Sequence, residues 1–158
     1  MHINRGFTLI ELMVTIAVLA IVIAIAAPSF TSVIQSNRTT ALHHEILGAL
    51  QLARSEAVKR RSDVIVCRSE DRVNCANGAD WTVGWIVREV AGDVVKVWDP
   101  VNGMALTGPN AGLVFHSSGM AQSVTNFTTT TASCAVGTKY EINVSLTGSA
   151  TANKTGCP

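Results

Sequence analysis

The stretch that decides the fold lies near the amino terminus and reads Gly6-Phe-Thr-Leu-Ile-Glu-Leu-Met-Val-Thr-Ile-Ala-Val-Leu-Ala-Ile-Val-Ile-Ala-Ile-Ala-Ala27. Residues 12–27 carry no charge, and with Phe7 to Ile10 they reach the roughly twenty apolar residues that cross a bilayer as a helix. Glu11 interrupts the run, where a charge costs about 2.5–3.5 kcal/mol on insertion scales. The sequence therefore predicts a hydrophobic helix over residues 7–28 that crosses a membrane, and a partner for the Glu11 carboxylate.

A secretory signal peptide is the alternative reading of this stretch. Arg5 would then belong to the charged region, and Ala24-Ile25-Ala26 would be the small-residue cleavage site. The acidic residue inside the apolar run and the length of that run both disfavour this alternative.

The six residues Gly6-Phe7-Thr8-Leu9-Ile10-Glu11 resemble the processing motif of type IV pilins and type II secretion pseudopilins. The resemblance implies that a prepilin peptidase cuts after Gly6 on the cytoplasmic side, removes the leader 1–6 and N-methylates Phe7. It also implies that Glu11 pairs with the Phe7 ammonium of a neighbouring subunit and sets the axial register, because a buried charge is tolerated only when it is matched.

Pro28 also matches the family, in which a proline near this point bends the helix or locally melts it in the filament. Proline removes one helical hydrogen bond and disfavours helix at the residue before it, here Ala27. A helix break is therefore expected at Pro28.

The whole chain has 158 residues, enough for one modest domain beyond the apolar helix, and a formal net charge of +1. Loss of the leader with Arg5 leaves eleven basic and eleven acidic residues, a balance that provides no general attraction for nucleic acid. Because positive charge before a span stays in the cytoplasm, the rest of the chain is expected in the periplasm.

All four cysteines, Cys67, Cys75, Cys134 and Cys157, follow the apolar stretch. An even number in an exported domain favours disulfides, with three possible connectivities. A single zinc site is the alternative, but neither pair has the close spacing of such sites. Pairing of Cys67 with Cys75 and of Cys134 with Cys157 closes the shortest loops and is the expected arrangement.

An amphipathic helix is predicted over residues 29–61, since Leu42, Ile46, Leu50, Ala53 and Ala57 recur at helical spacing on one face. His43 and Glu56 belong to the polar remainder of that helix. Glu56 and Arg60 form a favourable i,i+4 pair near its carboxyl end.

Residues 62–158 change to short β-branched or aromatic runs separated by turn residues, which predicts an antiparallel sheet. The expected strands are 64–68, 81–89, 94–98, 113–116, 127–131 and 140–146, with Thr128 to Thr131 as an edge strand or loop. Packing this sheet on the amphipathic helix produces an α+β domain, in which Trp81, Trp85 and Trp98 are expected to lie in the sheet core.

Several later segments resemble minor pilins and pseudopilins of the FimU, FimT and GspH kind. They are Leu52-Ala-Arg-Ser-Glu-Ala-Val58, the Cys67 to Cys75 loop, Trp81, Gly84-Trp-Ile-Val87, and Leu113-Val-Phe115 followed by Gly119. The resemblance implies the type IV pilin fold, a long amino-terminal helix packed on an antiparallel sheet. DNA-binding members carry a Gly-Arg-x-Arg pattern where this chain has Gly148-Ser-Ala-Thr151.

No residue pattern indicates catalysis, a cofactor or a metal. His43 and His44 are adjacent on a helix, so their side chains diverge by about 100° and cannot chelate one ion without a third ligand. His116 lies beside Ser117 and Ser118, but no serine lies in a nucleophile-elbow pattern. The chain is therefore not expected to be an enzyme.

The leading hypothesis is a non-catalytic minor pilin that primes or caps a type IV pilus. Its partners would be prepilin peptidase, other minor pilins, the major pilin and the inner-membrane assembly platform. It would lie in the inner membrane before assembly and in the filament or at its tip afterwards.

One alternative is a minor pseudopilin of a type II secretion system. The other is a DNA-binding pilin that uses Arg60, Arg61, Arg68, Arg72, Lys139 and Lys154, although binding of nucleic acid is not expected.

Overall fold

The computed structural model describes residues 7–132 and 138–156, except for the side chains of 26–29, 32 and 138. The chain divides into two compact units, residues 1–34 and 35–158. Its elements are α1 (Leu9–Arg60), β1 (Val64–Arg68), β2 (Trp85–Glu89), β3 (Val94–Trp98), β4 (Met104–Thr107), β5 (Leu113–Phe115), β6 (Thr125–Thr131), β7 (Thr138–Val144) and β8 (Ala150–Gly156). This is the predicted α+β class, with the order of helix before strands as expected.

The carboxyl end of α1 is capped by a main-chain hydrogen bond. Arg61 follows the helix in the left-handed conformation, with φ 55°, and the Ser62 N–H donates to the Ala57 carbonyl at 3.3 Å. This is the hydrogen bond of a Schellman motif, in which glycine is the usual left-handed residue. The helix ends within one residue of the predicted position because Arg61 takes that conformation.

In the second unit, one face of α1 lies against the sheets, as its apolar spacing predicted. Leu42, Ile46, Leu50, Ala53 and Ala57 are all buried. Two residues predicted on the polar side, His43 and Glu56, are buried as well. The prediction was wrong for these two because His43 stacks on Tyr140 of β7, and because Lys59 and Arg60 of the same helix bind the Glu56 carboxylate.

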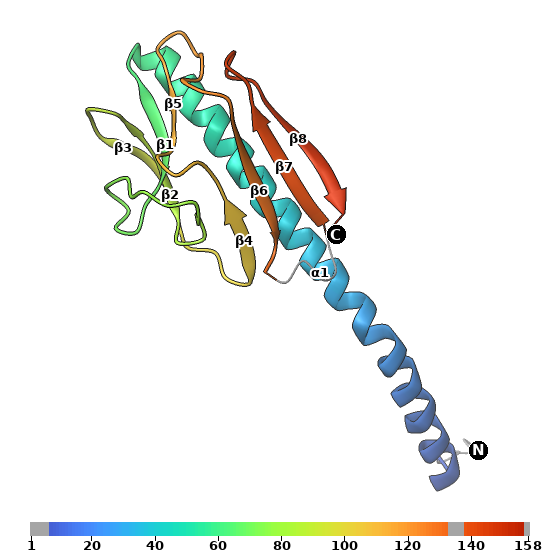
Figure 1. Cartoon of the computed structure of the whole chain (residues 1–158). Helices are drawn as coiled ribbons and strands as arrows, with labels where there is room; N and C mark the ends of the chain where they lie inside the picture. The colour runs from blue at the N-terminus through green and yellow to red at the C-terminus, as the bar shows by residue number, and fades with distance from the viewer. Residues whose placement is uncertain (1–6, 133–137, 157–158) are drawn as a thin grey trace, which may run out of the picture. The chain divides into compact units, whose positions relative to one another are not determined.

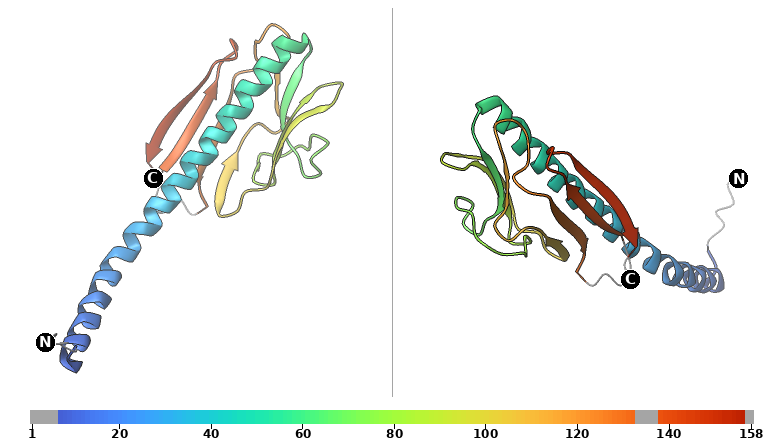
Figure 2. Two further views of the ribbon diagram at one scale, coloured as in Figure 1. Left: turned by 180° about the vertical axis from the view of Figure 1, so that it is seen from behind. Right: turned by 45° about the horizontal axis from the view of Figure 1, so that its top comes forward.

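The second unit contains two four-stranded antiparallel sheets where the sequence predicted one. Their strand orders are β3-β2-β1-β5 and β4-β6-β7-β8. Within this unit both sheets lie against α1, which is in front of them in the left view of Figure 2, and Figure 1 labels the strands. One core of helix and sheet residues fills the space between them.

Several strand predictions were wrong in detail. Strands β4 and β8 had no signal in the sequence, and Trp81 precedes β2 without belonging to it. Thr128–Thr131 is in an inner strand, because β6 pairs with both β4 and β7. Side chains on β6 alternate, so that Phe127, Thr129 and Thr131 are buried. Threonine therefore occupies core positions that pattern reasoning assigned to an edge or loop.

Trp81 packs against β6. Its ring meets Phe127 of β6 edge-on, with centroids 5.0 Å apart, and its indole N–H donates to the Pro109 carbonyl at 3.2 Å. Gly108 packs closely against the Phe127 ring, and a Cβ at this position would be 2.7 Å from a ring carbon. The predicted core roles of Trp81 and Trp85 are confirmed, since both are fully buried. Trp98 is partly buried and stacks on Trp85 with centroids 5.9 Å apart.

Candidate assembly site

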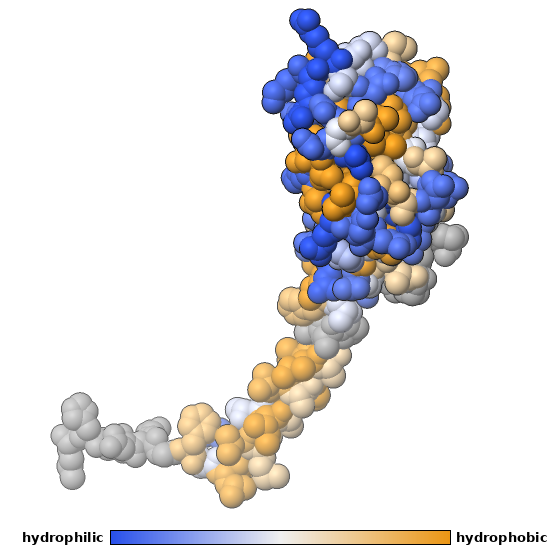
Figure 3. Space-filling view, turned by 90° about the vertical axis from the view of Figure 1, so that its left-hand side faces the viewer, coloured by the Kyte–Doolittle hydropathy of each residue, from blue (hydrophilic) through white to orange (hydrophobic). Residues whose placement is uncertain are grey.

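The first part of α1 carries a continuous exposed apolar surface. Every residue from Phe7 to Ile25 is exposed in the isolated chain, with Phe7 at 75% and Ile25 at 73%. Apolar side chains follow one another along this segment in Figure 3. A contiguous apolar surface of this kind is typical of a segment that contacts other proteins or lipid.

Within residues 7–132 and 138–156, no helix combines the length and the apolar character that crossing a bilayer requires.

Thr8 caps the first turn of α1. The Glu11 N–H donates to the Thr8 hydroxyl at 3.3 Å, and the Leu12 N–H donates to the Thr8 carbonyl at 3.2 Å. Thr8 and Glu11 have the Thr-x-x-Glu spacing of a capping box, which the sequence analysis missed although the spacing is visible there. Near the amino terminus of a helix, the partial positive charge of the backbone favours a carboxylate. The position of Glu11 therefore suits a negative charge even in the single chain.

The Glu11 carboxylate is exposed, and no partner for it occurs among residues 7–132 and 138–156. The expected partner, a Phe7 ammonium, belongs to a neighbouring subunit. Gly6 lies outside the described residues, so its role in processing remains a prediction. Pro28 lies within the continuous span assigned to α1, so the helix break expected there is not seen in the single chain and stays a prediction for the assembled filament.

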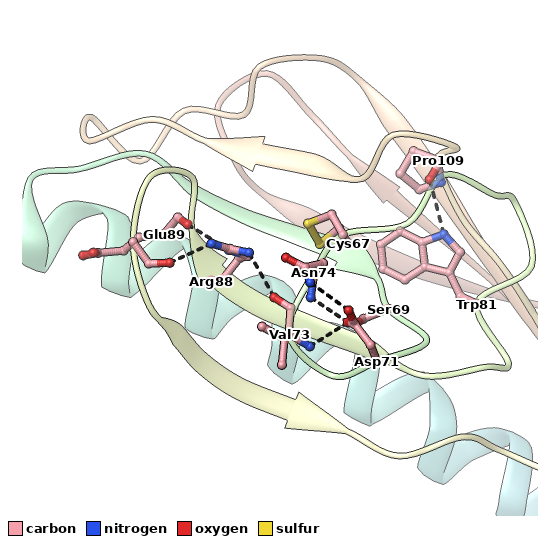
Figure 4. The surroundings of a disulfide bond; sticks show 11 residues. Cys67, Ser69, Asp71, Val73, Asn74, Trp81, Arg88, Glu89 and Pro109 are labelled. Carbon is pink, nitrogen blue, oxygen red and sulfur yellow. Dashed lines mark hydrogen bonds between the residues drawn. A yellow bond between two sulfur atoms is a disulfide. The ribbon is translucent and has the colours of Figure 1, made fainter.

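The predicted disulfide between Cys67 and Cys75 is confirmed. Their Cα atoms are 5.5 Å apart, and the bond closes a loop of eight residues in sequence separation against β1 (Figure 4). Cys67 is buried within β1, whereas Cys75 is exposed. Cys134 and Cys157 lie outside the described residues, so their pairing remains a prediction.

The Asp71 carboxylate accepts hydrogen bonds from other residues of the disulfide loop and so stabilises the conformation of the loop. Asp71 accepts from the Val73 N–H at 2.9 Å, the Asn74 N–H at 2.7 Å, the Asn74 side-chain amide at 2.7 Å and the Ser69 hydroxyl at 3.2 Å (Figure 4). These donors, above all the Asn74 main-chain and side-chain groups, hold the pKa of Asp71 well below its ordinary value. The loop therefore has a defined shape that does not depend on the disulfide alone.

Arg88 ties the same loop to β2. Its guanidinium donates to the Val73 carbonyl at 2.9 Å and to the Gly92 carbonyl at 2.8 Å (Figure 4). The loop and the β2–β3 turn are thus held by one side chain. Sequence reasoning singled out neither Asp71 nor Arg88, and only the Asp-x-x-Asn spacing could have indicated the turn.

The structure does not bring the six candidate DNA-contact residues together. Arg60 lies at the end of α1, where it pairs with Glu56 and Glu89. Arg61 follows it and is exposed. The predicted Glu56–Arg60 pair is confirmed, and the hydrogen bond from Arg60 and then that from Lys59 lower the pKa of Glu56.

The other four basic residues are in two further places. Arg68 and Arg72 belong to the disulfide region; Arg68 donates to the carbonyls of Asp80 and Asn77 and pairs with Glu70, and Arg72 pairs with Asp99 at 2.8 Å. Lys139 pairs with Glu141 at 2.7 Å on β7, and Lys154 is on β8. Neighbouring carboxylates therefore offset the charge of most of this set.

The histidines have structural surroundings. His43 stacks on Tyr140 of β7 with ring centroids 4.3 Å apart, and burial, followed by the nearby His44, lowers its pKa. His116 Nδ1 lies 3.0 Å from an Asp63 carboxylate oxygen at the other end of the domain. Within residues 7–132 and 138–156, no group of three or more potential metal ligands occurs.

Comparison with known families produced two matches. The family described as Type II transport protein GspH matches residues 43–148, and the prokaryotic N-terminal methylation motif matches residues 1–27. No curated protein matches this chain.

Two crystal structures of the type IV minor pilin FimU from Pseudomonas aeruginosa strain PAO1, in different space groups, are similar to this fold. One has 18% sequence identity and a TM-score of 0.55, over 72% of this chain and 91% of that chain. The other has 18% identity and a TM-score of 0.58, over 74% and 89%. Identity at this level shows the shared fold.

A long amino-terminal helix followed by antiparallel sheets packed on its second part, with an N-terminal methylation motif, defines the pilin class of proteins, and the type IV pilin fold predicted from the sequence is confirmed. Within that class the chain belongs to the GspH family, since the match covers about two thirds of its length. It is thus a minor pilin or pseudopilin of a type IV pilus or a type II secretion system.

Proposed function

We propose that this chain is a structural, non-catalytic minor pilin that primes or caps a type IV pilus. The observation that carries the proposal is the exposed, largely apolar surface from Phe7 to Ile25, in which Glu11 is the only charged residue. Such a surface is stable only when lipid or other subunits cover it. In this proposal the surface contacts membrane lipid before assembly and neighbouring subunits afterwards.

In this proposal prepilin peptidase removes residues 1–6 and methylates Phe7, and the second unit faces the periplasm. The new Phe7 ammonium of one subunit then meets Glu11 of its neighbour among apolar side chains. Any other stagger leaves a carboxylate unpaired in a low-dielectric bundle, so the pair sets the axial register. The partners are other minor pilins, the major pilin and the assembly platform of the inner membrane.

A minor pseudopilin of a type II secretion system is the second candidate, and the description of the matching family favours it. Processing and assembly through Glu11 are the same in both. Deletion of the chain separates the two functions, because loss of surface pili with normal protein export supports the first, and loss of export with normal pili supports the second. DNA binding is the least supported alternative, since the basic residues are dispersed and mostly paired with carboxylates.

Substitution of Glu11 by Ala tests the proposal. Membrane insertion should survive, because removal of the carboxylate makes the helix more apolar. Assembly should fail, since breaking a buried pair costs about 3–5 kcal/mol. That cost lowers an equilibrium constant by roughly 140- to 4,000-fold.

The measurement is the amount of processed chain in the membrane and in sheared filaments. The matched control is Thr15→Ala, which changes a residue of the same helix without changing its charge. A Gly6→Val variant should keep its leader, and mass spectrometry should find N-methylated Phe7 at the amino terminus of the wild type. Wild-type amounts of Glu11→Ala in filaments would contradict the register role.

A further inference from the structure

The chain contains two Asn-Gly pairs, Asn77-Gly78 and Asn102-Gly103. In such a pair the glycine nitrogen can attack the side-chain amide carbon of the asparagine, because glycine has no Cβ to hinder the approach. The reaction needs a glycine N–H that is free to lose its proton and a main chain that can move. The two pairs have the same chemistry but very different surroundings.

Asn77-Gly78 is held at several atoms. The Gly78 N–H donates to the Asn110 carbonyl at 3.0 Å, and the Asn77 carbonyl accepts from Arg68 Nη1 at 3.3 Å. The Arg68 side chain also packs against Gly78, with Nε 3.1 Å from the position of a Cβ. Attack by this nitrogen requires these contacts to open first.

Asn102-Gly103 is open by comparison. Both residues are exposed, and no atom lies within 4 Å of the position of a Gly103 Cβ. Among residues 7–132 and 138–156, neither the Asn102 side-chain amide nor the Gly103 N–H donates a hydrogen bond. The Gly103 carbonyl alone accepts a main-chain bond, from Ala132 at 3.4 Å. The pair lies in the link between β3 and β4, where the Val101 N–H, just before it, donates to the Thr82 carbonyl at 2.8 Å.

We propose that Asn102 is a site of spontaneous deamidation in the folded protein, whereas Asn77 is protected by the fold. The Gly103 nitrogen loses its proton to a solvent base and forms a bond to the Asn102 side-chain carbon, and ammonia leaves with a proton from water. One water molecule then opens the resulting succinimide at either carbonyl. The product is aspartate or isoaspartate, and the balance is one amide and one water converted to one carboxylate and one ammonium.

The modification changes the charge of a defined hollow in the second unit. A cavity of about 220 Å³ lies between α1 and the β3–β4 link, and it is lined by Arg38, Ala41, Leu42, Glu45, Val101, Asn102 and Met104. Its rim now carries one cation, one anion and the neutral Asn102 amide. Deamidation adds a second anion, and isoaspartate also lengthens the main chain by one methylene at this point.

The test follows both asparagines in one sample. Detergent-solubilised full-length protein is incubated at mildly alkaline pH in heavy-oxygen water, and tandem mass spectrometry measures isotope uptake at each residue. We expect uptake at Asn102 to be at least about tenfold faster than at Asn77, a ratio equivalent to about 1.4 kcal/mol. After unfolding in denaturant the two rates should converge, because the difference arises from the structure.

Two variants complete the experiment. Asn102→Gln should remove uptake at that position, since the longer side chain forms the ring far more slowly, and Asn77→Gln should leave the Asn102 rate unchanged. Equal rates in the folded protein, or faster uptake at Asn77, would overturn the proposal. A difference that persists after unfolding would also overturn it, because the fold would then not be its cause.

Discussion

Removal of the Cys67–Cys75 disulfide by the double substitution Cys67→Ala/Cys75→Ser should lower the free energy of unfolding by about 3 kcal/mol. The cysteines are separated by eight residues. On the chain-entropy account, closing a loop of this length restricts the unfolded state by about 2.5 kcal/mol. Loss of the buried Cys67 sulfur adds about 0.5 kcal/mol, near the lower end for a small cavity.

The loop should keep its folded shape in this variant. Asp71 still accepts its hydrogen bonds from within the loop, and Arg88 still binds the Val73 carbonyl. The loss should therefore act mainly through the unfolded state. For a chain of this size a change of about 3 kcal/mol corresponds to a fall of roughly 10 °C in melting temperature.

Urea unfolding followed by tryptophan fluorescence measures the change, since Trp81 and Trp85 are fully buried. Asp71→Ala, which keeps the disulfide and removes the loop hydrogen bonds, is the matched control. A decrease below about 1 kcal/mol would refute the entropic reasoning. A decrease above about 5 kcal/mol would show that the loop also contributes packing that this account omits.

Three further predictions concern the main chain and one carboxylate. Arg61→Gly should stabilise the fold by about 1 kcal/mol in urea unfolding, because Arg61 has φ 55° and glycine adopts that conformation without a steric cost. Gly148→Ala should destabilise the fold by about 2–3 kcal/mol, since its Cβ would lie 2.2 Å from the Gly119 carbonyl oxygen. Gly156→Ala is the control and should change stability little, because no atom lies within 4 Å of the position of its Cβ. Asp71→Asn should reduce the loss of stability in acid. The pKa of Asp71 in the folded protein lies below its ordinary value of 3.8, so the ionised carboxylate stabilises the fold above pH 3.8. This contribution is lost as the pH falls from 3.8 through the folded-state pKa, and the variant lacks it. An unchanged acid-unfolding profile would contradict this assignment.

Features with short sequence range were predictable. The buried face of α1 follows from apolar residues three and four positions apart, because helix geometry places them together whatever else the chain does. The Cys67–Cys75 bond, confirmed here, closes the shortest loop available to Cys67. The motif from Gly6 to Glu11 identified the class of protein, and the family match agrees with it. The Thr8 cap was also predictable, because the Thr8-x-x-Glu11 spacing is visible in the sequence, but it was missed.

Features that depend on distant pairing were decided by tertiary structure. The β8 segment has no β-branched or aromatic run and is a strand because β7 provides its partner. Thr129 and Thr131 are buried because β6 lies between β4 and β7, and His43 is buried because Tyr140 stacks on it. The basic residues are dispersed for the same reason. A sequence carries its own helical and local-loop geometry, whereas strand order and burial depend on contacts between segments whose pairing no local pattern encodes.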